Sequence, residues 1–379
     1  MTIFKPLAAD DRVSTKTLLH EAIPITGTIV SGTYIDSISG EPNNIQNFVH
    51  GMFQSVYDYP YLSSSANHIF DITFGMTKES DLYADLVAAD VQTAKKNNVY
   101  NQMAQVLMGY DQDGKIQKFD EDGDLTTSGD KLHDAAFLSF SRLLTKDEIK
   151  KGSFELEIGT TSTYATDGSV FGERIKIVDF GADQKYKVNS PAGEFGILYA
   201  TASAGTNILD TASTHTSSLS DGNTYWAAGL IFYQAGVAVL TSSVFMGATE
   251  GGFLNNGSAI WDGSYNTFTG SLVNEEISGS ADGLRTRMYN LQFNNTIELN
   301  STVYFCRAKH NEFNYSANPT YLNGSQIRVK DVGTDTPVSY ITSIGLYSAD
   351  NQLLAVGKFS EPIRKDSSIE LTFRARLDY

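Results

Sequence analysis

The chain has 379 residues, of which 41% are hydrophobic and 19% are charged, so it is a globular chain long enough for two or three domains. Its formal net charge is −16, and such an acidic balance argues against direct contact with DNA or RNA, which usually needs a basic patch. The single cysteine, Cys306, excludes an intrachain disulfide and fits assembly in a reducing cytosol.

Residues 1–40 form a polar segment that contains short Ile and Val runs but has no helical periodicity. They lack the apolar core of a signal peptide, because Asp10, Asp11 and Arg12 follow soon after Lys5. We interpret the segment as an extended arm with one or two short strands. The sequence leaves open whether this arm lies on a neighbouring subunit or on its own domain.

Residues 41–150 are predicted to be rich in helix. Within 45–56, apolar residues recur at the spacing of one face of a helix: Ile45, Phe48, Val49, Met52, Phe53 and Val56. A short strand is predicted at 68–74, followed by a second helix that Thr77 caps. The polar run 95–98 is expected to break or bend this helix, and 99–107 either continues it or forms a third helix.

After residue 152 the pattern changes to short strands separated by small and polar residues. Strands are predicted at 154–158, 174–180, 185–188, 194–201, 288–293 and 302–308, with long loops at 202–223 and 247–266. Residues 226–245 are apolar and about as long as a membrane-spanning helix. Because 234–236 divides them into two runs rich in β-forming residues, a buried hairpin is predicted there instead.

The last residues, 369–379, alternate strictly between apolar and polar types, which is typical of a half-buried strand. The apolar positions are odd-numbered: Ile369, Leu371, Phe373, Ala375, Leu377 and Tyr379. Two further strands are predicted at 338–347 and 353–359, joined by a turn at 348–352 that contains Asp and Asn.

Together these patterns predict an α+β chain, with a helical N-terminal part and a larger, β-rich, antiparallel, sandwich-like C-terminal part. We divide it into an extended arm at 1–40, a helix-rich domain at 41–150, a β-rich domain with long loops at 151–300, and a C-terminal β module at 301–379.

A cluster of carboxylates at 120–124 resembles the start of a calcium-binding loop. Asp120, Asp122 and Asp124 match the first, third and fifth positions, but the sixth is Leu125 and the twelfth is Lys131, where a calcium loop requires Gly and Glu. A similar run at 111–114 is better interpreted as a tight turn. The sequence therefore predicts no metal site.

Cys306 and His310 are close enough in sequence to raise the alternative of a thiol–imidazole pair, but a small buried thiol is the commoner fate of a single cysteine. The other histidines are scattered: His20, His50, His68, His133 and His215. The acidic pair Glu275 and Glu276 fits a solvated loop, although a sequence cannot exclude the two carboxylates of a glycosidase. We predict no catalytic, cofactor-binding or metal-binding residue, and no enzyme activity.

Two stretches resemble known hairpins. The first has Ile344-Gly345-Leu346-Tyr347, then a turn, then Leu354-Ala355-Val356-Gly357, and it resembles a hairpin of the baseplate-attachment modules of contractile-phage tail fibres. The second, at 230–241, resembles hairpins in structural proteins of large tailed phages. The whole chain resembles virion structural proteins of marine and cyanobacterial myophages.

The resemblance implies a non-enzymatic subunit of a phage tail, in the wedge of the baseplate, that joins copies of itself and other tail proteins. It implies a place in the virion after assembly in the host cytoplasm, with no nucleic acid bound directly and no insertion into a membrane. In tail fibres the similar hairpin is N-terminal, whereas here it is C-terminal, which favours a baseplate protein over a fibre. The alternatives are an adaptor that anchors fibres or binds a receptor, a neck or capsid protein, and a tail-associated depolymerase.

Overall fold

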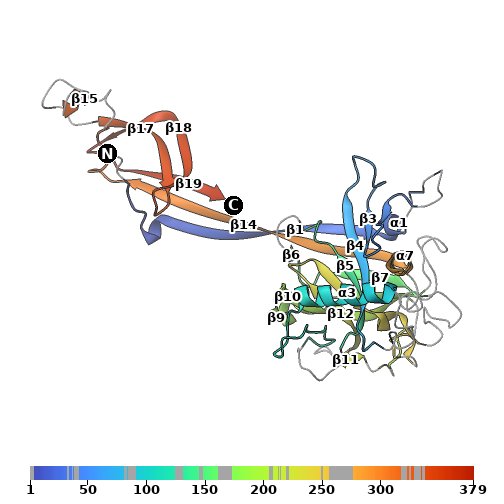
Figure 1. Cartoon of the computed structure of the whole chain (residues 1–379). Helices are drawn as coiled ribbons and strands as arrows, with labels where there is room; N and C mark the ends of the chain where they lie inside the picture. Colours follow the sequence, from blue (N-terminus) through green and yellow to red (C-terminus); the bar gives the residue numbers. More distant parts are fainter. Residues whose placement is uncertain are drawn as a thin grey trace. The chain divides into compact units, whose positions relative to one another are not determined.

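The computed structural model describes residues 4–31, 34–35, 37, 42–80, 83, 91–123, 131–144, 148–160, 173–204, 208–211, 213, 215–218, 222–248, 251–255, 276–316, 322–323, 326–327, 334 and 338–379 (Figure 1). The chain divides into two compact units. Unit 1 comprises Met1–Leu19 and Glu298–Tyr379, and unit 2 comprises His20–Ile297. Two long strands, β1 (Arg12–Thr26) and β14 (Met288–Ala308), contribute residues to both units.

Unit 2 is built mainly of antiparallel strands, in the order β14-β7-β8-β10-β12-β13-β5-β4-β3-β2. Their bounds are β2 (Ile45–Asn47), β3 (Gln54–Tyr57), β4 (His68–Met76), β5 (Asp134–Ser139), β7 (Glu155–Gly159), β8 (Arg174–Val178), β10 (Gly193–Ala204), β12 (Thr224–Phe232) and β13 (Val237–Thr241). Three shorter strands pair with members of this sheet: β6 (Glu148–Ile149) with β14, β9 (Lys187–Ser190) with β10, and β11 (Thr216–Ser218) with β12. The short helices are α1 (Gly27–Val30), α5 (Ala182–Lys185) and η2 (Ser242–Phe245).

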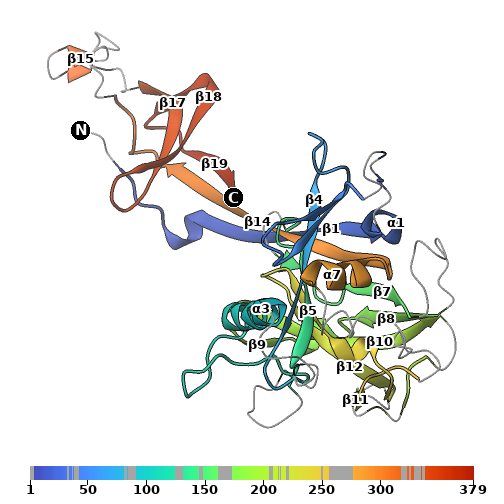
Figure 2. The ribbon, with the colours of Figure 1, turned by 45° about the vertical axis from the view of Figure 1, so that its right-hand side comes forward.

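Two longer helices, α3 (Val91–Leu107) and α7 (Ile277–Arg285), pack against β4 (Figure 2). Gly75 of β4 lies against the backbone of Tyr100 in α3. Gln54, the cross-strand partner of Ile72, hydrogen-bonds to Asp282 of α7 at 2.9 Å. Because side chains alternate along a strand, Ile72 and Gly75 face opposite sides, so the two helices cover opposite faces of the sheet.

The prediction of an α+β chain with a helical N-terminal part is wrong, because the described fold is β-rich and built mostly of antiparallel sheet. Residues 45–56, predicted as an amphipathic helix, form the β2–β3 hairpin, in which Ile45 lies opposite Val56. Gly51, with φ of +62°, lies in the connection, a backbone conformation that glycine adopts at little cost. Pairing of β3 with β4 buries Val56 completely, and this tertiary contact outweighs the local helical spacing.

The helix predicted to begin at Thr77 falls largely on residues outside the described part. Helix α3 runs without interruption from Val91 to Leu107, so 95–98 does not break it and 99–107 continues the same helix, which was one of the two alternatives predicted. Lys96, in the middle of that polar run, is fully buried. Its stem packs inside the fold, which the sequence pattern alone does not indicate.

Several strand predictions are confirmed. Strands β4, β7, β8 and β10 overlap the predicted runs, and 226–245 forms the buried β12–β13 hairpin together with η2. The two strands predicted at 288–293 and 302–308 are parts of one continuous strand, β14. No helix among the described residues has the length and apolarity needed to cross a bilayer.

The continuous hydrophobic core lies within unit 2. One aromatic cluster includes Tyr100, Phe119 and Phe137, with ring centroids 5.5–6.4 Å apart. A second joins Phe140 to Phe70, Phe154 and Phe293. Unit 2 therefore has a hydrophobic core of its own, whose buried aromatic side chains stabilise it as a domain.

Candidate assembly interface

Unit 1 is a small β module. The last eight described residues of β14 pair with the terminal strand β19 (Leu371–Asp378), with Ser301 opposite Asp378 and Ala308 opposite Leu371. On the other side of β14, the hydroxyl groups of Ser14 in β1 and Thr302 lie 2.9 Å apart. The hairpin of β17 (Val338–Tyr347) and β18 (Leu353–Asp366) completes the module, together with the short pair β15 (Leu322–Asn323) and β16 (Gln326–Ile327).

The alternation predicted for the last strand is confirmed. Along β19 every odd-numbered side chain is half-buried and every even-numbered one is exposed. Tyr379, which follows the strand, is an exception because it is 69% exposed. The inward face of β19 is thus apolar, but none of its side chains reaches full burial.

Incomplete burial extends over the whole of unit 1. Among its described residues, the buried apolar side chains are Ala308 and Val338. Large apolar side chains of the β17–β18 hairpin are instead exposed, including Leu354 at 67% and Val356 at 62%. Unit 1 therefore has apolar faces without a closed core, which in a monomeric protein is unusual.

These faces surround a hollow of about 930 Å³ that lies within unit 1. Four segments line it: residues 4–12, the end of β14 with Phe313 after it, the β17–β18 hairpin, and β19. Its apolar lining includes Phe4, Tyr304, Ile344, Leu346, Tyr347 and Phe373. We call this cavity the hollow. Its volume is at the upper end of the range of about 300–1,000 Å³ for ligand pockets.

Phe313 enters the hollow from a strained backbone. Its φ of 56° lies in the left-handed region, which a bulky residue rarely adopts. The hydroxyl group of Ser339 donates a hydrogen bond to the Phe313 carbonyl oxygen and holds this conformation. Strain of this kind is found preferentially where a side chain has to be presented to a ligand or partner.

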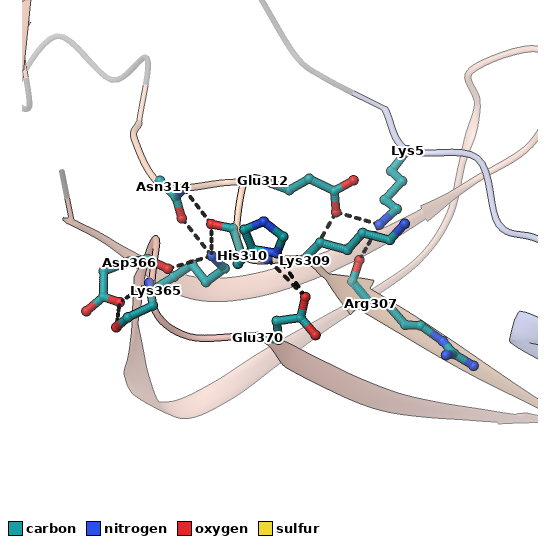
Figure 3. Close-up of polar contacts among 10 residues, drawn as sticks. Lys5, Arg307, Lys309, His310, Glu312, Asn314, Lys365, Asp366 and Glu370 are labelled. Atoms are coloured by element: carbon teal, nitrogen blue, oxygen red, sulfur yellow. Dashed lines mark hydrogen bonds and ion pairs between the residues drawn. The ribbon is translucent and has the colours of Figure 1, made fainter. Parts of the chain in front are cut away.

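A cluster of polar contacts fixes the loop that carries Phe313 (Figure 3). Lys365, which is fully buried, donates from Nζ to Asn314 Oδ1 at 2.6 Å, to the Asp366 carbonyl at 2.8 Å and to the His310 carbonyl at 3.3 Å. His310 Nδ1 lies 3.2 Å from Glu370 Oε1, and this hydrogen bond holds the pKa of Glu370 below its usual range. The loop from β14 is thus tied to the ends of β18 and β19.

Two ion pairs attach the N-terminal segment to the same module. Lys5 Nζ lies 2.5 Å from Glu312 Oε2 and donates to the Arg307 carbonyl at 2.8 Å (Figure 3). Arg307 Nε lies 2.7 Å from Asp11 Oδ1. Segment 4–11 therefore forms a wall of the hollow, a role that the sequence analysis did not assign to the arm.

Cys306 and His310 do not form a catalytic pair in the described part of the chain. Cys306 lines the hollow, whereas His310 contacts Glu370. Burial, with a smaller contribution from the charge of Asp11, raises the pKa of the Cys306 thiol. A raised thiol pKa is the opposite of what a nucleophilic cysteine requires.

In the calcium-loop candidate, the first carboxylate forms an ion pair with a lysine of the same loop. Lys131, at the twelfth position of the motif, pairs with the carboxylate of Asp120, while Asp124 and Leu125 lie outside the described residues. Glu276 is exposed just before α7, and Glu275 lies outside the described part. The described residues contain no group of three or more His, Cys, Asp or Glu side chains arranged to hold a metal ion.

The other histidines lie in separate environments. His68 Nε2 is 2.7 Å from Asp71 Oδ1, His215 Nδ1 is 2.8 Å from Glu121 Oε2, and His20 Nδ1 is 3.2 Å from Thr296 Oγ1. His133 contacts the hydroxyl group of Thr77, and the ring of His50 stacks on that of Phe48. These contacts tie neighbouring segments together and are structural.

A smaller cavity of about 360 Å³ lies in unit 2 between α3, β4, β5 and residues 50–53. Among the described residues that line it, Asp71 is the one that carries a carboxylate. Burial opposes ionisation of Asp71, but hydrogen bonds from His68 and Ser55 outweigh burial and lower the pKa. A single carboxylate is not the pair that a glycosidase mechanism needs.

Comparison with known proteins adds no relative: no family model, curated protein or solved structure matches this chain significantly. The hollow of unit 1 is the candidate functional site. Its strands were predicted: 369–379 from strict alternation, and 338–347 and 353–359 as two runs joined by a turn at 348–352. No pattern in the sequence indicated that residues from 4–12 also line the hollow.

Proposed function

We propose that this chain is a non-enzymatic structural subunit of a phage tail, located in the baseplate wedge, where it joins copies of itself and other tail proteins. The observation that carries the proposal is the open apolar hollow of unit 1. A module with two buried apolar side chains among its described residues gains stability when a partner covers its faces. Unit 2, with its own core, serves as the body of the subunit.

The assignment to a phage tail rests on the hairpin resemblance. The two halves of the resembling motif pair directly in β17–β18: Ile344 lies opposite Gly357, Gly345 opposite Val356, and Leu346 opposite Ala355. The motif is therefore one structural element, and it lies at the hollow. An attachment role for this hairpin is what the resemblance implies.

Electron microscopy of the virion tests the proposal. Antibodies raised against the purified chain and coupled to gold should label the baseplate end of intact particles from the phage that encodes it. Labelling of the neck or capsid would contradict the baseplate assignment. Absence of the chain from purified particles would contradict a virion role altogether.

A fibre-anchoring adaptor is the second candidate, because the similar hairpins belong to attachment modules of tail fibres. In that case the gold label should lie where fibres join the baseplate, and particles lacking fibres should retain the chain. A baseplate body protein would instead be required for the baseplate to assemble.

A further inference from the structure

The two units differ greatly in charge. Counted over the whole sequence, unit 1 has 12 Lys and Arg against 11 Asp and Glu, whereas unit 2 has 16 against 33. Unit 1 therefore has a formal net charge of +1 (12 minus 11), and unit 2 has one of −17 (16 minus 33). Contacts between the unit 2 of one copy and the unit 2 of another are opposed by electrostatic repulsion, so copies of the chain meet more favourably through unit 1.

Unit 1 has a convex apolar element as well as a concave one. The tip of the β17–β18 hairpin exposes Tyr347, Leu353 and Leu354 at 42%, 54% and 67%. Tyr347 and Leu354 also line the hollow, so the tip and the hollow are adjacent on one surface. A two-fold contact between two such surfaces places each tip at the hollow of the other copy.

The charges at these two elements are complementary. Asp350 is exposed at the tip, in the turn between β17 and β18, and Arg12 is exposed in the lining of the hollow. Neither side chain has an ion-pair or hydrogen-bonding partner among the described residues. Lys5 and Asp11, which also line the hollow, are already paired with Glu312 and Arg307. Arg12 is thus the lining cation available to a carboxylate that enters with the tip.

We propose that the hollow of unit 1 receives the β17–β18 hairpin tip of a second copy of this chain, in a reciprocal contact in which Asp350 of each copy pairs with Arg12 of the other. This inference rests on the proposed assembly role and adds the identity of the partner. It covers the exposed leucines of the tip and the aromatic lining of the hollow in a single contact.

The single cysteine provides a direct probe. Cys306 lines the hollow, so a tip that enters should shield its thiol from N-ethylmaleimide. We expect the labelling rate of the full chain to fall roughly tenfold when nine tenths of it is dimeric, because labelling then proceeds through the free monomer. Sedimentation velocity on the same samples should show the mass of two chains.

Charge reversal tests the pairing. Arg12→Asp and Asp350→Arg should each weaken dimerisation by roughly tenfold or more, and the double variant should restore it, because the swapped charges still pair across the contact. Lys358→Glu is the matched control, since Lys358 is an exposed cation of the same hairpin outside the lining, and it should dimerise like the unmodified chain. Leu354→Asp should prevent dimerisation while leaving the circular dichroism spectrum unchanged.

A chain that remains monomeric, with a labelling rate independent of concentration, would overturn the proposal. A dimer in which Cys306 is labelled as fast as in the monomer would also overturn it, because the contact would then lie elsewhere. A double charge variant that fails to recover would exclude the Asp350–Arg12 pairing. Failure of the tail assignment is a separate result, because gold labelling of virions does not depend on whether the purified chain dimerises.

Discussion

The ring centroids of Phe359 in β18 and Phe373 in β19 lie 4.8 Å apart, and this contact joins the β17–β18 hairpin to the terminal strand. Both side chains are half-buried. The pair therefore stabilises unit 1 where the structure offers few other apolar contacts. It also sets the distance between two of the elements that line the hollow.

Phe373→Ala should lower the free energy of unfolding of unit 1 by about 1–2 kcal/mol, less than the roughly 3–5 kcal/mol of a core phenylalanine, because the side chain is only half-buried. Hydrogen exchange of the β14–β19 amides at low protein concentration measures the loss locally.

The alternation of β19 extends this prediction to other positions: Leu371→Ala and Leu377→Ala should also destabilise the strand. Arg374→Ala is the control and should leave the exchange rates unchanged. Equal losses of stability for substitutions at odd-numbered and even-numbered positions would show that both faces of β19 are buried.

Lys365→Met should loosen the loop that carries Phe313. The substitution keeps an apolar stem of similar length but removes three hydrogen bonds from a buried ammonium group. Hydrogen bonds of charged groups contribute about 1.5–3 kcal/mol, so the loss should be of at least this order. Protease sensitivity at 309–316 is the measurement, and Lys358→Met, at an exposed site, is the control. Unchanged cleavage in the Lys365 variant would show that the loop is held by its other contacts.

Gly75→Ala should destabilise unit 2. A Cβ at this position would lie 2.7 Å from the backbone nitrogen of Tyr100, so α3 would have to move away from β4. Overpacking of this kind costs about 1–3 kcal/mol, which thermal unfolding of unit 2 would reveal. Gly283→Ala in α7 is the control: apart from the neighbouring backbone of α7 itself, no described atom lies within 4 Å of the added methyl group. Because alanine favours a helix, stability should stay constant or rise. A Gly75 variant as stable as the control would mean that α3 adjusts without cost.

The sequence predicted the strands of unit 1 better than the N-terminal half of unit 2. The alternation at 369–379 and the turn residues at 348–352 are local signals, and both indicated strands that the structure contains as β19 and the β17–β18 hairpin. At 45–56 the apolar residues have helical spacing, yet β3 pairs with β2 on one side and with β4 on the other, and the β4 partners lie more than ten positions away in sequence. Long-range pairing decided the structure there against the local pattern.

The hollow was less predictable than its strands. Its lining combines residues from 4–12 with residues from Tyr304 onward, and no local pattern relates segments so far apart in sequence. The strained φ of Phe313 and the burial of Lys365 are likewise consequences of the folded loop. The prediction that even-numbered residues of β19 are exposed did, however, correctly indicate which face of the strand turns away from the hollow.

Asp179 should make the stability of unit 2 depend on pH. Its carboxylate is almost fully buried and accepts hydrogen bonds from the backbone N–H groups of Gly152 at 2.7 Å and Phe154 at 3.0 Å, and from the hydroxyl group of Tyr233 at 3.2 Å. Burial outweighs these donors and raises the pKa of Asp179 to about 6. In the unfolded chain the same group has its ordinary pKa of about 3.9.

Between these two pKa values the folded state binds more protons than the unfolded state, so the contribution of Asp179 to stability falls as the pH rises. The contribution is fully present below about pH 4 and is lost as the pH rises through about 6, with a total change on the order of 3 kcal/mol at 1.36 kcal/mol per pKa unit.

Urea unfolding of the full chain between about pH 4 and pH 7 measures this change in stability. Asp179→Asn should lack this contribution, although the variant should be less stable because its amide N–H₂ faces a backbone donor. The difference between the pH profiles of the unmodified chain and the variant isolates Asp179 from carboxylates such as Asp71, whose lowered pKa contributes with the opposite sign. A difference that does not change with pH would assign the pH dependence to other groups, and a difference that grows as the pH rises would show that the three donors, rather than burial, determine the pKa of Asp179.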